Sequence, residues 1–190
     1  MTSASETTAA PGLEQLTSQL DELRGRVDKQ GDPDALAIVL FSGELDKMLA
    51  AFVMATGAAA SGMRVSLFCT FWGTAALKRK GSQMPNKSLV ERAFGWLLPG
   101  GLHRRRLSKL DFGGFGRRLM AREMRKKQVP DLETLLEIAK ETGVKLHVCD
   151  MSMHLMGIRQ EELIDYPDRK VCGVASFLEI SSRAGTTLFI

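Results

Sequence analysis

The sequence predicts an α/β fold: an open, doubly wound, mainly parallel sheet of four or five strands, with an extra N-terminal helix. Short apolar runs without polar alternation recur along the chain, as in strands that are buried on both faces. Stretches with helical periodicity separate these runs, which is typical of crossovers between parallel strands. Hydrophobic residues make up 44% of the 190 residues and charged residues 25%, as in a domain that buries a core.

Residues 1–31 are expected to form a disordered start and one amphipathic helix, ahead of a single α/β domain at residues 32–190. Five apolar residues recur at alternating spacings of 3 and 4 on a polar background: Leu13, Leu16, Leu20, Leu23 and Val27. This is the a/d pattern of a helical seam. We expect the seam to contribute to a homo-oligomer; the competing outcome is that it packs on its own domain.

Two strands and a connecting helix are expected to form the first β-α-β unit. The runs 35–41 (ALAIVLF) and 64–70 (RVSLFCT) are apolar enough to be buried parallel strands. The stretch between them carries apolar residues at helical spacing, with Ser42 as the expected N-cap and Gly62 as the expected end. A short helix is expected to follow at Trp72.

The rest of the domain is expected to add two or three strands. The expected elements, in chain order, are a basic helix at 115–127, an amphipathic helix from Asp131 to Gly143, a strand at 144–149, a short helix at 152–158, a weak strand at 170–172, a helix at 173–183 and a strand at 186–190. Gly185 is expected to end the last helix.

Positive charge is concentrated in an irregular excursion at about residues 78–127. This segment holds 15 Lys and Arg against 3 Asp and Glu, a net charge of +12, while the whole chain carries only +4. One interpretation is a solvated basic loop, and the other is a surface for an anionic partner. Few aromatic residues are interleaved with the charges, so nucleic acid is the less favoured partner.

The composition argues against several classes of protein. Three cysteines without a C-x-x-C pair argue against a disulfide scaffold and against a structural zinc site, so no metal is expected. No dinucleotide or phosphate-loop motif follows the first strand, and no cofactor is expected. No apolar run reaches the roughly 18 residues of a membrane span, and no targeting signal is visible, so we expect a cytoplasmic protein.

Three predicted strand ends carry residues that suit a ligand site. In an open parallel sheet, ligands bind beyond the carboxyl ends of the strands. The first end carries Ser42 and Gly43, whose backbone N–H groups could hold an anion, and the second carries Trp72, a candidate pocket wall. The third end contributes three more candidate pocket residues: Met151, Ser152 and Met153.

Cys149 is the residue expected to carry the chemistry. It ends a predicted strand just before a predicted helix, and a helix N-terminus stabilises a thiolate and makes it nucleophilic near neutral pH. Cys172, just ahead of the last helix, is a candidate second thiol. Cys69 lies inside an apolar run and is expected to be a core residue.

Four segments resemble a known family: ALAIVLFSGELDKMLAAFVMATGAAASG, VSLFCTFWGTAAL, VKLHVCDMSMHLMGIRQEELID, and GVASFLEIS followed by TTLFI. They run from Ala35 to Ile190, and the C-x-M-S-M-x-x-M-G-I pattern that begins at Cys149 is the most specific. The resemblance is to the DsrE/DsrF/DsrH-like proteins, in the branch called peroxiredoxin-like. Two positions depart from that branch: His154 stands where an acidic residue is expected, and Cys69 where an aromatic one is.

The resemblance implies a DsrE-like fold and a role in sulfur transfer. It implies a sulfur carrier or sulfurtransferase that holds a persulfide or thiosulfonate on Cys149. The implied partners are rhodanese-like and TusA-like proteins, which would exchange sulfur with that cysteine. The alternative is a non-catalytic module that binds an anionic partner (nucleic acid, an acidic protein or a nucleotide) through the basic segment.

Overall fold

The computed structural model describes residues 12–29, 31–81, 87–89, 92–93, 100–101, 106–109, 111–167 and 169–190. The chain divides into two units, Met1–Gly31 and Asp32–Ile190. The first contains helix α1 (Leu13–Lys29), as predicted, and the four leucines of its seam are 45–86% exposed. The predicted disordered start, the side chain of Val27 and much of the excursion between 82 and 105 lie outside the described residues.

The second unit is built on a five-stranded parallel sheet with the strand order β4-β3-β2-β1-β5. The strands are β1 (Asp32–Leu40), β2 (Arg64–Cys69), β3 (Lys145–Cys149), β4 (Lys170–Cys172) and β5 (Ala184–Phe189). This confirms the predicted fold class, including the weak strand that is now β4.

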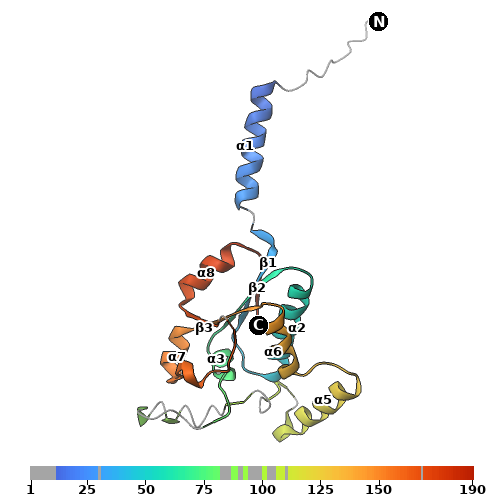
Figure 1. Ribbon diagram of the computed structural model, residues 1–190, viewed down its shortest axis with the longest axis vertical. Helices are drawn as coiled ribbons and strands as arrows, with labels where there is room; N and C mark the ends of the chain where they lie inside the picture. The colour runs from blue at the N-terminus through green and yellow to red at the C-terminus, as the bar shows by residue number, and fades with distance from the viewer. Residues whose placement is uncertain are drawn as a thin grey trace, which may run out of the picture. The chain divides into compact units, whose positions relative to one another are not determined.

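Helices cover both faces of the sheet (Figure 1). The helices are α2 (Leu45–Ala60), α3 (Trp72–Ala76), α5 (Phe115–Lys126), α6 (Leu132–Glu141), α7 (Asp150–Met156) and α8 (Val174–Ser182), with 3-10 turns η2 (Phe112–Gly114) and η3 (Gln160–Glu162). α2 and α6 pack over the larger apolar core, while Phe177 of α8 packs on the opposite face. Strand side chains alternate between these faces, so Val148 belongs to the larger core and Cys149 lies on the α8 face.

The predicted N-cap at Ser42 is wrong, because α2 begins only at Leu45, after Glu44. The chain first passes over the start of α3 so closely that a Cβ on Gly43 would lie 2.6 Å from the carbonyl oxygen of Trp72. That contact keeps the residues after β1 out of the helix. Ser42 turns its hydroxyl to Glu44, accepting from its backbone N–H at 3.2 Å and donating to its carboxylate at 3.0 Å.

The predicted end of the last helix at Gly185 is also wrong, because α8 ends at Ser182 and Gly185 lies in β5. There a Cβ would sit 2.6 Å from the carbonyl oxygen of Asp32, so glycine serves the approach of β5 to β1 and does not end a helix. The short helix expected at 152–158 begins two residues earlier, at Asp150.

The excursion between α3 and α5 is fixed to the domain at two places. The Lys87 Nζ lies 2.6 and 2.7 Å from the two carboxylate oxygens of Glu162, and both side chains are buried. At the start of α2, Leu45 donates its backbone N–H to the Arg106 carbonyl at 2.8 Å, and Ser108 donates to the Asp46 carboxylate. The excursion therefore accepts a hydrogen bond from one of the first N–H groups of α2, the backbone N–H of Leu45.

Candidate functional site

The carboxyl ends of β4, β3, β2 and β1 lie side by side, because these parallel strands are neighbours in that order. Figure 1 shows α3 and α7 at this edge of the sheet. The order brings Cys172, Cys149, Thr70 and Ser42 together as consecutive strand ends. The topology thus collects the predicted residues at one edge, where open parallel sheets bind ligands.

Cys149 ends β3 and is the N-cap residue of α7, and its side chain is fully buried. Burial raises the pKa of its thiol. Hydrogen bonds from the Ser152 and Thr70 hydroxyls and from the backbone N–H groups of Ser152 and Met151 outweigh burial, so the pKa lies below its ordinary value. A cysteine with a lowered pKa has the thiolate that attacks electrophilic sulfur.

Ser152 joins the ends of two strands. Its hydroxyl oxygen lies 3.1 Å from the Thr70 Oγ1 and accepts a 2.9 Å hydrogen bond from the backbone N–H of Phe71. The Ser152 hydroxyl has one proton, which can be donated either to Thr70 or to the sulfur of Cys149. Phe71 has φ 44° and ψ −118°, a conformation that costs energy for a residue with a side chain and is concentrated at functional sites.

Cys172 is the direct register partner of Cys149 on the neighbouring strand. Its Sγ lies 3.9 Å from the Nδ1 of His147, which is two residues before Cys149 on the same face of β3. Burial raises the pKa of the Cys172 thiol, and so does the neighbouring charge of Cys149. The two cysteines therefore differ: the hydrogen bonds favour the thiolate at Cys149 and burial favours the thiol at Cys172.

The remaining predicted residues take different places at this edge. Ser42 and Met153 are buried, while Trp72 and Met151 are 45% and 51% exposed. Gly43 packs against the backbone of Trp72, as described above. Cys69, on the face opposite Cys149, is fully buried, and burial raises the pKa of its thiol strongly.

Two contributors to the site were missed from the sequence. The Thr70 hydroxyl and the Phe71 amide both act through the strand order, which periodicity does not give. His147 was expected near Cys149 from its place in the same strand, as a metal ligand or as an aid to the cysteine, and the structure places its Nδ1 3.9 Å from the Cys172 Sγ. Among the described residues, no three His, Cys, Asp or Glu side chains are grouped so as to hold a metal ion.

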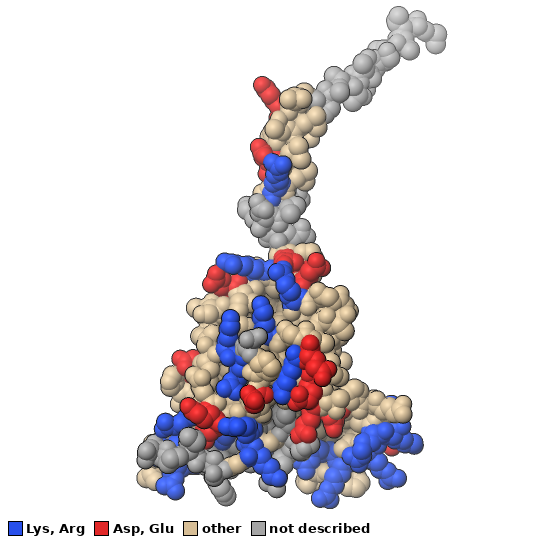
Figure 2. Space-filling view, in the orientation of Figure 1, with Lys and Arg blue, Asp and Glu red and all other residues tan. Residues whose placement is uncertain are grey.

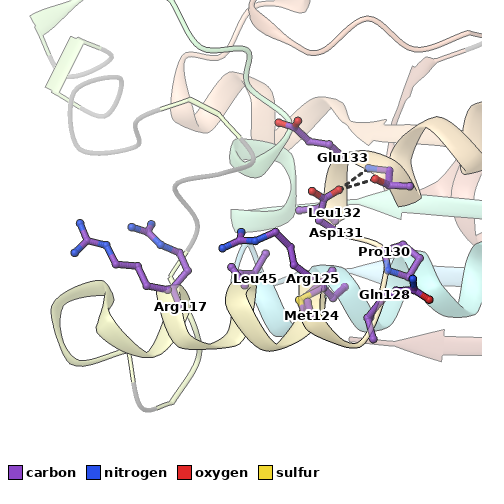
Figure 3. A pocket seen from close by; sticks show the side chains of 14 residues that line it. Leu45, Arg117, Met124, Arg125, Gln128, Pro130, Asp131, Leu132 and Glu133 are labelled. Carbon is purple, nitrogen blue, oxygen red and sulfur yellow. Dashed lines mark hydrogen bonds between the residues drawn. The ribbon is translucent and has the colours of Figure 1, made fainter.

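A separate groove of about 610 Å³ lies between α5 and the start of α6, on the sheet face opposite Cys149 (Figure 3). Leu45, Leu49 and Met124 form part of its apolar lining, and Arg117 and Arg125 contribute charged side chains from α5. Asp131 and Glu133 line the α6 side, where Asp131 accepts hydrogen bonds from Thr134 at the helix start. The basic segment contributes α5 to the groove, and α2 and the start of α6 form the rest of it, apart from the cysteine site.

Fold and site together define a class of protein: an α/β domain with a hydrogen-bonded cysteine at the carboxyl edge of its sheet. The chain belongs to the DsrE/DsrF/DrsH-like family, whose model matches residues 33–189. This confirms the family resemblance seen in the sequence.

The alignments of this chain with two relatives cover nearly the whole length of each relative. YrkE of Bacillus subtilis (strain 168), described as uncharacterized, is 41% identical over 153 residues, covering 80% of this chain and 94% of the relative. The sulfur carrier protein DsrE2 of Allochromatium vinosum is 31% identical over 167 residues, covering 82% and 97%. The crystal structure of the ychN protein from E. coli aligns with a TM-score of 0.47 at 13% identity, covering 85% of this chain and 99% of that one.

None of the helices formed by the described residues is both long enough and apolar enough to cross a bilayer.

Proposed function

We propose that this chain is a cytoplasmic sulfur carrier or sulfurtransferase that holds sulfur on Cys149 and passes it to partner proteins. The observation that carries the proposal is the place of Cys149 at the start of α7, beside the linked hydroxyls of Ser152 and Thr70, where hydrogen bonding lowers the pKa of its thiol. The relative described as a sulfur carrier supports the same class of function.

The chemistry is two exchanges at sulfur. The Cys149 thiolate attacks the terminal sulfur of a polysulfide or a thiosulfonate donor; an S–S bond forms and the donor's leaving group departs with the electron pair. A partner thiolate then attacks the outer, carried sulfur, and Cys149 leaves as thiolate. The hydrogen bonds from Ser152, Thr70 and the α7 backbone stabilise that leaving thiolate, and a thiol of lower pKa leaves faster.

Because Cys149 is buried, sulfur transfer to a partner protein requires a conformational change at the site. The Cys149 side chain has no exposed surface, so a partner reaches the sulfur only after a local opening at the sheet edge. Trp72 and Met151 are exposed at the same edge, and a partner that contacts them would approach the covering residues. We expect rhodanese-like and TusA-like proteins to be such partners.

Single-turnover transfer tests this function. The Cys172→Ser variant, which lacks the thiol on the neighbouring strand, is loaded with polysulfide, desalted and mixed with a TusA-like acceptor, and the masses of both proteins are followed. We expect one sulfur atom to leave the loaded chain as the acceptor gains one. Adding Cys149→Ser to this background should abolish transfer, and adding Cys69→Ser should leave it unchanged. Transfer at an unchanged rate after Cys149→Ser contradicts the proposal.

A second candidate function, binding of an anionic partner, is supported by α5. Six cations lie on or directly after this helix: Arg117, Arg118, Arg122, Arg125, Lys126 and Lys127. None of them forms an ion pair with any residue that the structure describes. Figure 2 shows their side chains gathered over α5. Phe112 and Phe115 are 76% and 67% exposed beside them.

We propose that an acidic protein surface covers this helix. The groove beside α5 has an apolar lining next to arginines that form no ion pair with any residue the structure describes. Partner binding should weaken in Arg122→Glu and lose part of its salt dependence, whereas Lys145→Glu, at the amino end of β3, should bind like wild type. Equal weakening by both substitutions would contradict a role for α5. Salt-dependent binding to random DNA instead would favour nucleic acid.

A further inference from the structure

Cys149 and Cys172 occupy matching positions on adjacent strands. They are register partners in the β3–β4 pair, and both side chains belong to the face that α8 covers. Neighbouring strands lie about 4.8 Å apart, which falls within the roughly 4.4–6.8 Å that a disulfide spans between Cα atoms. Both cysteines are free thiols.

A third group stands beside them. The Nδ1 of His147 lies 3.9 Å from the Cys172 Sγ, and its Nε2 is buried without a hydrogen-bond partner among the described residues. Burial lowers the pKa of this imidazole, and the charges of Lys170 and Lys145 lower it further, so the ring is neutral near pH 7. A neutral ring with Nδ1 directed at a thiol can accept that thiol's proton.

We propose that Cys172 is the resolving thiol of Cys149: it displaces the carried sulfur by forming a Cys149–Cys172 disulfide, with His147 taking its proton. This inference rests on the proposed function, because it begins from a loaded Cys149. It assigns the domain a second outcome besides transfer to a partner, namely release of the cargo as a small molecule.

The step balances within the site. His147 removes the Cys172 proton, and the Cys172 thiolate attacks the inner sulfur of the Cys149 persulfide. The bond between the two cysteine sulfurs forms, the bond to the outer sulfur breaks, and the outer sulfur leaves as hydrosulfide, which takes the proton. The Cys172 sulfur is oxidised and the released sulfur is reduced, while the oxidation state of the Cys149 sulfur does not change. A thiosulfonate cargo would leave as sulfite by the same attack, and an external dithiol reductant would restore both thiols.

The position of Cys172 suits this role better than that of Cys69. Cys172 is the last residue of a three-residue edge strand and is partly exposed, so its sulfur can shift toward Cys149 at little cost to the core. Cys69 lies on the other face of the sheet, where its register partner is Val148. Cys69→Ser is therefore a matched control.

The first arm of the test follows the end state after polysulfide loading. Wild type and Cys69→Ser are expected to end with a Cys149–Cys172 disulfide, seen as the loss of two hydrogens in the intact mass and confirmed by peptide mapping. Cys172→Ser is expected to retain one extra sulfur atom on Cys149. Retention of that sulfur by wild type to the same extent as by Cys172→Ser overturns the proposal.

The second arm uses no sulfur donor and separates this inference from the proposed function. Reduced protein is titrated with the dithiol oxidant diamide, and the expected product is the same Cys149–Cys172 disulfide. A different pairing, or none, overturns the inference even if Cys149 takes up sulfur. If the disulfide forms here but no variant takes up sulfur in the first arm, the pairing holds and the sulfur-carrier function fails.

Discussion

The backbone N–H of Phe71 donates a 2.9 Å hydrogen bond to the hydroxyl of Ser152, joining the end of β2 to the first turn of α7. Phe71 holds this bond from a backbone conformation that is unfavourable for any residue except glycine. The bond holds the Ser152 oxygen in place as an acceptor, and the Ser152 hydroxyl can still donate its proton to Cys149. The reactivity that we propose for Cys149 would therefore depend on two segments that are distant in the sequence, the end of β2 and the first turn of α7.

Ser152→Ala should slow alkylation of Cys149. The substitution removes the hydrogen bond from the Ser152 hydroxyl to the thiolate and keeps the one from its backbone N–H, so the pKa of Cys149 rises and the thiolate fraction at pH 7 falls. A hydrogen bond to a charged group is worth about 1.5–3 kcal/mol, which predicts a rate at least about tenfold lower at pH 7. The rates of variant and wild type should converge at a pH above both pKa values.

The control for this effect is Ser181→Ala on α8, whose hydroxyl bonds Thr187 away from the site. Its pH–rate profile should overlay that of wild type. An unchanged profile for Ser152→Ala would show that this hydroxyl does not stabilise the thiolate.

Cys149 should be the first of the three cysteines to react with iodoacetamide at neutral pH. Alkylation requires a thiolate, which the hydrogen bonds favour at Cys149, whereas burial raises the pKa of both Cys69 and Cys172. Peptide mass mapping after limited labelling measures the order. Preferential labelling of Cys69, or equal labelling of all three, would contradict Cys149 as the reactive thiol.

Gly43→Ala should destabilise the domain, because its Cβ would lie 2.6 Å from the Trp72 carbonyl oxygen and the backbone would have to shift. We expect a loss of about 1–3 kcal/mol in the free energy of unfolding. Gly57→Ala is the matched control: it lies inside α2 with nothing within 4 Å of its Cβ, and should gain about 1 kcal/mol. Denaturant unfolding of both variants measures the difference, and equal stability would refute the close packing.

Deleting residues 1–31 should reduce the oligomeric state. The leucines of the α1 seam are exposed, and burying each between chains contributes roughly 1.5–3 kcal/mol, which symmetry doubles. Light scattering of full-length and truncated protein measures the mass. The same mass for both excludes α1 from an interface, and a monomeric full-length chain at micromolar concentration refutes the oligomer.

The fold followed from the sequence because its signals are local. The apolar runs became β1, β2 and β3, and the amphipathic stretch after Asp131 became α6, with Asp131 accepting from Thr134 as its N-cap. The errors at Ser42 and Gly185 arose because the chain at these positions packs against segments that are distant in the sequence. Gly43, next to Ser42, lies against the backbone of Trp72, and Gly185 lies against the backbone of Asp32. A glycine that ends a helix and one that admits a neighbouring backbone look alike in a sequence.

The site was predictable only as a set of strand ends. Cys149 could be placed at a strand end, but not beside Thr70 or Cys172, because the strand order was unknown. Counting along β2 from its pairing with β3 places Thr70 opposite Cys149, so the strand order and the register together would have revealed this contact. The buried state of Cys149 also depends on α8, whose Phe177 packs on the same small cluster.

The central claim is that Cys149 carries the sulfur. The most direct measurement is the intact mass of Cys172→Ser, in which a loaded Cys149 cannot be resolved, after incubation with polysulfide and desalting. We expect a gain of one sulfur atom, which peptide mapping places on Cys149. A dithiol reductant should remove this sulfur atom. The gain should be absent when Cys149→Ser is added to the same background. A sulfur gain that persists without Cys149, or no gain while Cys149 is present, would contradict it.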